Sequence, residues 1–556
     1  MDVSKLPSHH PVPWDTKFEA MALPDMFART TQRNPGAPLL HFLGRTFSYG
    51  ELYREAEAFA HAIRAHGIAA GDRVGLFLPN VPTYVAAYYG AMMAGAVVVN
   101  FSPLYTVEEL STQVADSGTR LLVTVDVPEL YGTAAAVLGA SALETLVVAR
   151  LSAMLPTVKG LAMRLFARRK IARVAYGDSV LDWSRLLAGV APGPELPVVA
   201  AGDLALLQYT GGTTGTPKGA MLSHANLSIN AQQAASLSPF GSPENECFMG
   251  ALPFFHVFAN TALLNHAVVT GASIAMVPRF ETKQVLQTIE TYKTTGFPGV
   301  PTMFQALLDH PDLATTDVST IKVCISGGAP LAAPLREKFE AATDIRLVEG
   351  YGLTESSGVV SANPYRGKRK PGTIGQVVAG TEILLLDKED AAKIALDGEP
   401  GELAIHGPQV MQGYWNRPEV AKDVFVEHHG KRWLRTGDVA TVDEEGFIEI
   451  VDRIKDMIAV GGFKVFPSQV EDVLLENEAI KEALVIGVPD DYLGERPRAY
   501  VTLNSGSEAT GEALAAWLNA RIGKHERVES VVVREELPKT MIGKLDRKAL
   551  RAEVFG

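Results

Sequence analysis

The chain has 556 residues and a formal net charge of −12, and its hydrophobic and charged residues (47% and 21%) are near the averages for globular proteins. This composition excludes a mainly disordered chain, the acidic balance excludes a general nucleic-acid binder held by phosphate contacts, and the length predicts more than one domain. With only two cysteines, Cys247 and Cys324, the chain offers neither a disulfide scaffold nor a CxxC metal site, which fits a reducing compartment.

The N-terminal segment 1–14 is polar and rich in Pro and His, unlike a secretory signal peptide. The longest apolar run, residues 85–99, is shorter than the ~20 residues of a membrane span, and Gly95 divides it into a buried helix and a strand. We therefore expect a soluble, cytoplasmic protein.

In the first third of the chain, predicted strands and helices alternate. Residues 40–43 and 45–47 form a hairpin around Gly44, and Ser48 and Glu51 form a capping box at the start of a helix that runs to about residue 66. The elements that follow are strand 73–78, helix 83–94, strand 96–101, a helix begun by the capping box of Thr106 and Glu109, and strand 121–125. This alternation predicts an α/β fold whose mostly parallel sheets are flanked by helices.

Segment 145–177 differs in charge from the rest of the acidic chain. It contains seven basic residues and no acid: Arg150, Lys159, Arg164, Arg168, Arg169, Lys170 and Arg173. A solvated surface helix explains this pattern, and so does a patch that docks on anionic lipid through 158–173. The sequence leaves both hypotheses open.

A change of pattern near residue 452 predicts a domain boundary. The charged run 452–456 and the pair Gly461-Gly462 precede a compact α+β pattern. It comprises a helix capped by Ser468 and Glu471, strands 483–488, 499–503 and 531–533, and a helix over 512–522. About one hundred residues suffice for a small domain, so we expect a large domain 1–451 and a small, mobile C-terminal domain 452–556.

Segment 208–219, QYTGGTTGTPKG, is the most informative part of the sequence. Its glycines, threonines and Lys218 supply exposed N–H groups, hydroxyl donors and one positive charge, which together suit a polyphosphate. It is not a Walker A loop, because no Gly-Lys pair in the chain is followed by Ser or Thr. Taken alone, the segment also fits a simple turn.

Four further motifs carry candidate chemistry, although each also fits a structural role. Segment 325–330, ISGGAP, offers small residues against which a flat ring can lie. Segment 349–355, EGYGLTE, offers Tyr351 for stacking and Glu355 for Mg²⁺. Asp438 of the Thr-Gly-Asp motif 436–438 can accept hydrogen bonds from ribose hydroxyls, and Lys544 lies in a glycine turn near the C-terminus.

These motifs occur in one order along most of the chain: YTGGTTGTPKG, EGYGLTE, TGD, the 452–455 run DRIK and the Gly543-Lys544 pair. The sequence resembles the AMP-forming acyl-CoA synthetases, the adenylate-forming family that also contains luciferases and adenylation domains. Segments 100–105, 252–258, 407–415 and 451–457 resemble the bacterial long-chain fatty-acid–CoA ligases in particular.

The resemblance implies a two-step reaction with ATP, Mg²⁺ and coenzyme A. A fatty acid is activated to acyl-AMP with release of pyrophosphate, and coenzyme A then displaces AMP. The implied ATP and AMP ligands are Thr210, Gly211, Gly212, Thr213, Thr214, Gly215, Lys218, Gly328, Ala329, Glu349, Tyr351, Gly352, Thr354, Asp438 and Arg453. Lys544, His256, Glu355 and Thr210 would be catalytic, and Glu355 and Thr210 would hold the metal.

The resemblance also implies that the C-terminal domain rotates about a hinge at Lys455 between the two steps. The turn of Gly461, Gly462 and Phe463 would then face the coenzyme A thiol. Contact with the inner face of a membrane and a homodimer are both compatible with the sequence, which fixes neither the acyl chain length nor the pathway.

The sequence leaves one alternative within the same class of enzyme and one in a different class. A ligase for medium-chain, dicarboxylic or aromatic acids would share every motif above. A non-catalytic nucleotide-binding or lipid-surface protein would share the fold, but the charged motif residues are all present, which argues for an enzyme. A P-loop kinase is excluded by the missing Gly-Lys-Ser/Thr.

Overall fold

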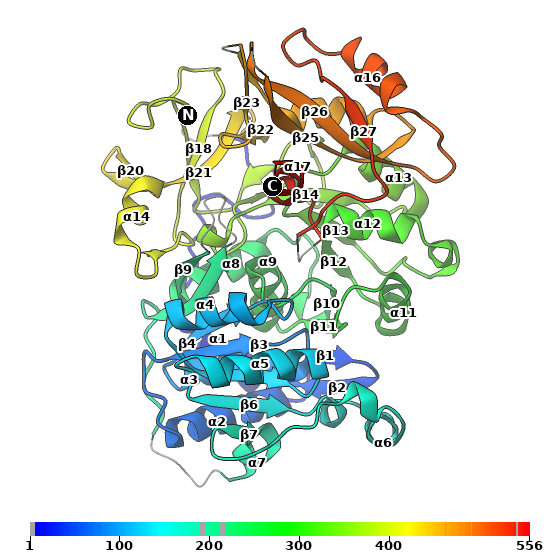
Figure 1. Cartoon of the computed structure of the whole chain (residues 1–556). Coiled ribbons are helices and arrows are strands. Elements are labelled where there is room, and N and C mark those ends of the chain that lie inside the picture. Colours follow the sequence, from blue (N-terminus) through cyan, green and yellow to red (C-terminus); the bar gives the residue numbers. More distant parts are fainter. Residues whose placement is uncertain are drawn as a thin grey trace.

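The computed structural model describes residues 6–189, 195–210, 217–461, 463–490, 492–540 and 543–555. The described strands form four sheets, two of which are large and mostly parallel, as the α/β prediction requires. Figure 1 shows these two sheets in the blue-to-green part of the chain, with the C-terminal strands in orange at the opposite end.

The first large sheet has the strand order β19-β9-β8-β4-β3-β5-β6-β7. Its central strands pair in parallel, whereas β8–β9 and β9–β19 are antiparallel. The strands are β3 (Arg73–Phe77), β4 (Val97–Phe101), β5 (Thr119–Val125), β6 (Thr145–Ala149), β7 (Val180–Asp182), β8 (Leu204–Thr210), β9 (Lys218–Ser223) and β19 (Gly413–Tyr414).

The second large sheet has the order β16-β15-β14-β13-β12-β10-β11-β1-β2, with antiparallel strands only at its two edges. The strands are β1 (Pro38–Phe42), β2 (Arg45–Ser48), β10 (Cys247–Gly250), β11 (Ser273–Met276), β12 (Gly296–Gly299), β13 (Val323–Gly327), β14 (Leu347–Tyr351), β15 (Ser361–Ala362) and β16 (Gln376–Val377).

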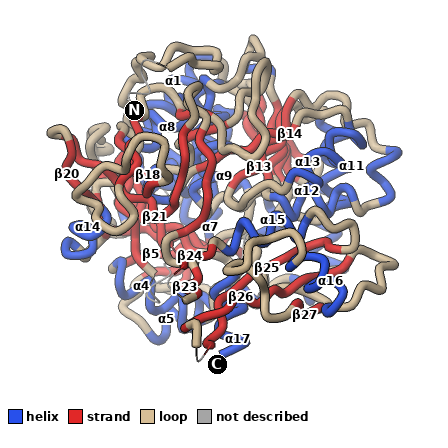
Figure 2. Tube along the Cα trace, turned by 90° about the horizontal axis from the view of Figure 1, so that it is seen from above, coloured by secondary structure: helices blue, strands red, loops and turns tan. Residues whose placement is uncertain are grey.

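Two smaller sheets follow. The third has the order β17-β18-β21-β20 with β22 paired to β21, and is formed by β17 (Glu382–Leu386), β18 (Gly401–His406), β20 (Phe425–His428), β21 (Lys431–Val442) and β22 (Ile448–Arg453). The fourth contains β23 (Ile458–Val460), β24 (Phe463–Val465), β25 (Ile480–Asp490), β26 (Gly494–Leu503) and β27 (Val531–Val533). This C-terminal sheet has its own hydrophobic cluster, and Figure 2 shows its strands together on one side of the molecule.

Helices cover the sheets. In the N-terminal part they are α1 (Leu23–Arg33), α2 (Tyr49–Ala65), α3 (Pro82–Met93), α4 (Val107–Ser117), α5 (Pro128–Ala140), α6 (Thr157–Phe166), α7 (Trp183–Ala188) and α8 (His224–Ser236). Further on are α9 (Val257–Ala259), α10 (His266–Thr270), α11 (Thr282–Tyr292), α12 (Pro301–Leu308), α13 (Ala333–Thr343), α14 (Pro418–Val424), α15 (Pro467–Leu475), α16 (Gly511–Asn519) and α17 (Arg547–Phe555). None of the helices in the described ranges is long and apolar enough to cross a membrane.

Helix α3 is buried at every residue from Pro82 to Met93. The Tyr84 hydroxyl lies 2.8 Å from both Asn100 Oδ1 on β4 and the Phe254 carbonyl oxygen beyond β10, so it connects the two large sheets. Tyr88 and Tyr89 donate to side chains of the π-helical turn Asn260–Asn265. This helix therefore fixes how the two sheets lie against each other.

Local predictions were tested at three helix starts. The capping box of Thr106 and Glu109 is confirmed in both of its bonds. Ser48 accepts from the Glu51 backbone N–H, but the Glu51 carboxylate pairs with Arg45 at 2.6 Å, because a charge-assisted bond outweighs the reach back to the cap.

The prediction that Ser468 caps a helix is wrong. Helix α15 begins at Pro467, whose fixed φ suits the first helical position, and Phe466 precedes it without a side-chain cap. The Ser468 N–H donates to Asp452 instead, and Glu471 accepts from Val485 N–H and pairs with Arg547.

Close packing of α2 on α3 gives a stability prediction. A Cβ atom on Gly90 would lie 2.5 Å from the Ala56 carbonyl oxygen, so Gly90→Ala must force the two helices apart. We expect the free energy of unfolding to fall by about 1–3 kcal/mol, measured by chemical denaturation. The matched control is Gly132→Ala on α5, where a Cβ meets nothing within 4 Å and stability should rise by about 0.5–1 kcal/mol. Equal effects of the two changes would contradict this account.

Candidate active site

Strands β8, β13 and β14 end close to the predicted motifs. The carboxyl ends of parallel strands are where α/β sheets bind ligands. Thr210 ends β8 and is paired in register with Lys218 at the start of antiparallel β9. The predicted Gly211, Gly212, Thr213, Thr214 and Gly215 lie outside the described residues.

Lys218 is connected to Glu355 through an aromatic residue. The Lys218 ammonium lies 5.6 Å from the centre of the Tyr414 ring, and the Tyr414 hydroxyl donates to Glu355 Oε1 at 2.6 Å. Burial, followed by the negative charge of Glu355, raises the pKa of Tyr414 above its ordinary value. The phenol therefore keeps its proton and donates a hydrogen bond to the carboxylate. The Met411 N–H bonds the Glu355 carbonyl oxygen, so the backbone of this residue is also fixed.

The turn after β13 holds the predicted Gly328 and Ala329. Gly328 has a φ of +82°, and a Cβ there would lie 2.4 Å from Lys544 Cε. The Lys544 side chain, which comes from near the C-terminus, therefore lies directly against this glycine. Thr302 Oγ1 donates to the carbonyl oxygen of the neighbouring Gly543 at 2.8 Å and holds the turn in place.

A second group joins β14 to the third sheet. The Tyr351 hydroxyl donates to Asp438 Oδ2, and Arg453 Nε donates to Asp438 Oδ1 at 3.0 Å. Asp438 is almost fully buried and faces Arg453 across the β21–β22 pair. Burial, with the negative charge of Asp438 beside it, raises the pKa of Tyr351 well above its ordinary value, so its hydroxyl stays a donor.

Lys544 and His256 are both partly buried, and the charge of the lysine acts on the imidazole. Burial, followed by the positive charge of Arg453 and opposed by the negative charge of Asp438, lowers the pKa of Lys544 to about 8. Burial also lowers the pKa of His256 to about 3, with Lys544 contributing, so this imidazole is neutral at physiological pH. Its Nδ1 accepts from the Phe258 N–H at 3.3 Å and starts the short helix α9.

The remaining residues of the EGYGLTE segment shape its backbone. Glu349 Oε1 accepts from the Leu331 N–H at 3.2 Å, which connects β14 to the turn after β13, and burial raises the pKa of Glu349 to about 8. A Cβ on Gly352 would lie 2.0 Å from the Gly358 carbonyl oxygen, so only glycine fits there. Thr354 opens the 3₁₀ turn Thr354–Ser356 that carries Glu355.

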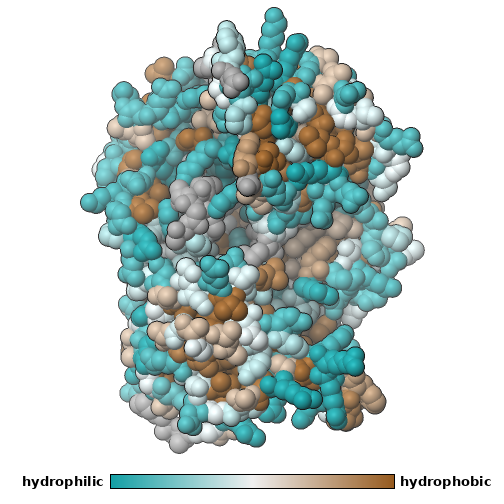
Figure 3. All heavy atoms as spheres, in the orientation of Figure 1, coloured by the Kyte–Doolittle hydropathy of each residue, from teal (hydrophilic) through white to brown (hydrophobic). Residues whose placement is uncertain are grey.

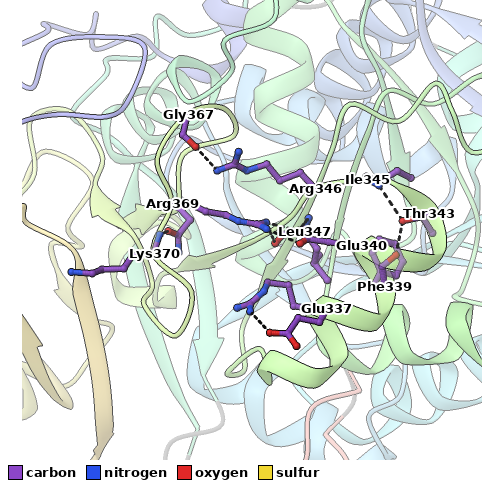
Figure 4. Close-up of polar contacts among 12 residues, drawn as sticks. Glu337, Phe339, Glu340, Thr343, Ile345, Arg346, Leu347, Gly367, Arg369 and Lys370 are labelled. Carbon is purple, nitrogen blue, oxygen red and sulfur yellow. Dashed lines mark hydrogen bonds and ion pairs between the residues drawn. The ribbon is translucent and has the colours of Figure 1, made fainter.

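Arginines anchor the other end of β14 (Figure 4). Arg369 Nη2 donates to Glu340 of α13 at 2.6 Å, and the same carboxylate accepts from the Leu347 N–H. Arg346 donates to the Gly367 carbonyl oxygen. Burial, together with the positive charge of Arg369, lowers the pKa of Arg346. This network fixes the start of β14, which carries Glu349 and Tyr351 at its other end.

The predicted coenzyme A turn lies in a different sheet from these residues. Gly461, with a φ of +55°, joins β23 to β24, and its N–H donates to the Leu493 carbonyl oxygen at 2.8 Å. Phe463 begins β24, whereas Gly462 is outside the described residues. Lys455 lies in the turn between β22 and β23, where the third sheet passes into the fourth.

Tyr414 and Thr302 were not among the predicted site residues. Tyr414 lies 59 residues from Glu355, and Thr302 lies 241 residues from Gly543, so no local periodicity could connect them. A partial signal was available for Tyr414, because it follows a glycine in the aromatic pair Tyr414-Trp415.

The group has the composition of an anion site. Lys218, Lys544 and Arg453 supply positive charge, and Thr210 supplies a hydroxyl at a strand end. No cluster of three or more metal-binding side chains occurs in the described ranges. A single carboxylate such as Glu355 with one hydroxyl fits Mg²⁺, which usually takes one or two protein carboxylates and completes its shell with phosphate oxygens and water.

Comparisons with known proteins cover nearly the whole chain. The sequence model described as AMP-binding enzyme matches residues 27–415, and the one described as AMP-binding enzyme C-terminal domain matches residues 469–544. A long-chain-fatty-acid–CoA ligase from Bacillus subtilis (strain 168) is 36% identical over 98% of this chain and 96% of its own length. A feruloyl-CoA synthase from Amycolatopsis sp is 33% identical, with coverages of 94% and 97%.

Solved structures give the same result for the fold. The ATP-bound MatB from Rhodopseudomonas palustris is 28% identical, with a TM-score of 0.83 over 96% of this chain and 99% of that one. The anthranilate CoA ligase AuaEII, in complex with anthranoyl-AMP, is 25% identical with a TM-score of 0.84 and the same coverages.

The contact between Tyr414 and Glu355 can be tested directly. Tyr414→Phe removes the hydroxyl that orients the carboxylate while keeping the ring beside Lys218. A hydrogen bond to a charged group contributes about 1.5–3 kcal/mol, so we expect kcat/KM for Mg·ATP in pyrophosphate exchange to fall about 10- to 100-fold. Tyr131→Phe on α5 is the control. An unchanged dependence on Mg²⁺ and ATP in Tyr414→Phe would rule out the positioning role.

Proposed function

The chain belongs to the AMP-binding enzyme family, and we propose that it is a long-chain fatty-acid–CoA ligase that forms AMP. The observation that carries the choice of acid is the near full-length similarity to ligases named for long-chain fatty acids, at 36% identity in Bacillus subtilis and 35% in Escherichia coli O157:H7. The similarity to a feruloyl-CoA synthase supports the alternative of an aromatic acid.

In the first step, a carboxylate oxygen attacks the α-phosphorus of ATP. The bond from that phosphorus to the bridging oxygen breaks, and pyrophosphate leaves with the electron pair. A carboxylic acid has a pKa of about 4, so it is ionised without a general base, and the step needs alignment and charge neutralisation. In the second step, the thiol of coenzyme A gives up its proton to solvent and its sulfur attacks the acyl carbon. The bond from that carbon to the AMP oxygen breaks, and AMP leaves with the electron pair.

Each residue of the site has a proposed role. Thr210, Lys218 and residues 211–215 would bind the β- and γ-phosphates. Tyr351 and the Gly328–Ala329 turn would receive the adenine ring, and Asp438 with Arg453 would bind the ribose. Mg²⁺, held by Glu355 and Thr210, would neutralise phosphate charge.

We propose that Lys544 acts in the first step only. Its side chain packs against the Gly328 turn, and its charge is influenced by Arg453 and Asp438, so it would reach the carboxylate of the acid and the α-phosphate oxygens of a nucleotide bound there. The neutral His256 imidazole beside it would line the carboxylate end of the acyl site without competing for the negative charge.

The division into two domains is part of the proposal. Residues 452–556 would rotate about Lys455 after adenylation, and the turn of Gly461, Gly462 and Phe463 would replace Lys544 at the acyl-adenylate. The separate sheet and hydrophobic cluster of the C-terminal part support a unit that moves as a body. We further propose a cytoplasmic enzyme that works at the inner face of a membrane, where its fatty acid partitions, and contacts it through the basic segment 158–173.

The acid itself is tested with a panel. AMP formation should be measured with palmitate-like, octanoate-like, dicarboxylic and aromatic acids, each with and without coenzyme A. We expect the highest kcat/KM for the long-chain acid and release of AMP only when coenzyme A is present. Turnover of aromatic acids without turnover of palmitate-like acids would select the alternative.

The role of Lys544 is tested by separating the half-reactions. Lys544→Ala should lose pyrophosphate exchange by at least about 100-fold, as expected when a charged transition-state contact is removed, but should still convert a supplied acyl-adenylate to acyl-CoA. The control is Lys548→Ala, an exposed lysine on α17. Equal loss of both half-reactions would refute the assignment.

The pH profile gives a second readout of the same lysine. Because the pKa of Lys544 is lowered to about 8, the charged form is lost as pH rises through that value, and kcat/KM for ATP in pyrophosphate exchange should fall there. Lys544→Arg keeps its charge and should remove this alkaline limb. Coenzyme A is absent from this assay, so its thiol cannot produce the limb.

A further inference from the structure

Helix α6 (Thr157–Phe166) contacts the rest of the protein along one narrow face. Gly160 is buried, and a Cβ there would lie 2.4 Å from the Ser152 carbonyl oxygen. Met163, three residues further on, is partly buried on the same side. Since residues three and four apart share a helix face, this side of α6 is the one that contacts the protein.

The opposite side of α6 is apolar and faces outward. Exposed fractions are 80% for Val158, 57% for Leu161, 49% for Leu165 and 87% for Phe166. At 100° per residue, these side chains point away from Gly160. A surface helix normally turns its polar face to water, whereas α6 turns an apolar face to it.

Basic side chains border this apolar face. Lys159 and Arg164 lie on its two sides, and the 3₁₀ turn η3 (Arg168–Lys170) follows with all three residues exposed. Lys159 and Arg168 donate to backbone carbonyl oxygens, which leave their charges unneutralised. Figure 3 shows apolar and hydrophilic residues side by side at the lower right, over α6.

We infer that the outward face of α6, together with Arg168, Arg169 and Lys170, docks on a bilayer that carries anionic headgroups. The apolar side chains would enter the boundary between headgroups and acyl chains, and the basic side chains would contact lipid phosphates. The inference makes the proposed membrane contact specific, and it rests on the proposed function only in that a long-chain acid is a substrate found in membranes.

A second copy of the chain fits this face less well. A two-fold contact brings the same residues of both copies together, so the basic residues beside α6 would face their own counterparts. Segment 145–177 has no acid to compensate them. An anionic bilayer instead satisfies both the apolar and the charged components. Figure 1 shows α6 at the end of the molecule opposite the C-terminal sheet, so a docked enzyme keeps that sheet away from the lipid.

The test is co-sedimentation of the full chain with vesicles, without ATP, coenzyme A or fatty acid. Vesicles of phosphatidylcholine with 30% phosphatidylglycerol should bind the protein, and phosphatidylcholine alone should bind it at least tenfold more weakly. Replacing Arg168, Arg169 and Lys170 by Gln should lower the partition coefficient for the anionic vesicles about 100-fold. Replacing Leu161, Leu165 and Phe166 by Ser should lower it at least tenfold.

Matched controls remove the same groups elsewhere. Lys283, Lys422 and Lys524 are exposed lysines on other elements, and their replacement by Gln should leave binding within twofold of wild type. Val198→Ser with Leu396→Ser removes two exposed apolar side chains away from α6. All variants should keep turnover of a water-soluble acid.

Besides a failure to bind anionic vesicles, two outcomes overturn the inference. One is binding to anionic vesicles that the α6 and η3 variants leave unchanged. The other is a dimer in light scattering that the Ser variant dissociates, which would make this face a contact between copies. Vesicle binding without ligase activity would refute the proposed function but not the docking surface. Ligase activity without vesicle binding would refute the docking surface but not the proposed function.

Discussion

Three buried tyrosine hydroxyls on α3 connect the sheets from which the site is built. Tyr84 joins β4 to the turn after β10, and Tyr88 and Tyr89 hold the π-helical turn that follows His256. A buried hydroxyl without a partner costs about 1–3 kcal/mol, so each contact favours a single arrangement of the two sheets. Thr210 lies at the end of one sheet and Tyr351 at the end of the other, and their separation therefore depends on a helix that contains no candidate site residue.

Within this frame, burial sets the charge state of each group. Tyr351 and Tyr414 remain protonated and donate to Asp438 and Glu355, which fixes the two carboxylates that matter most for the proposed nucleotide and metal. His256 is neutral, so of these two neighbouring side chains only Lys544 carries a positive charge. If the proposed nucleotide binds here, Lys544 would supply positive charge to its phosphate.

The sequence predicted what depends on neighbours in the chain: the alternation of strands and helices, the capping box at Thr106 and the glycine turns. It did not predict what depends on distant partners. Glu51 pairs with Arg45 instead of the helix cap, and α15 begins at Pro467. Tyr414 bonds Glu355, which lies 59 residues away in the sequence. Helix α6 shows the same limit, because its pattern of apolar and basic residues does not say which side faces the protein. Only Gly160, packed on Ser152, decides that.

Beyond the β21–β22 pairing beside the proposed hinge and the contact of Lys544 with the Gly328 turn, the described contacts of the C-terminal part with the large domain include three exposed or partly buried polar contacts. Lys481 pairs with Asp309, Lys464 with Glu389, and Thr302 bonds Gly543. The two ion pairs are exposed, and such pairs contribute about 0–1 kcal/mol each. If the proposed hinge operates, a ligand that prefers one position tenfold shifts the balance by about 1.4 kcal/mol, which is comparable to these contacts. Cellular levels of ATP, pyrophosphate and coenzyme A would then set the fraction of molecules in each arrangement. The ligand bound at each step would thus select the arrangement that the next step needs.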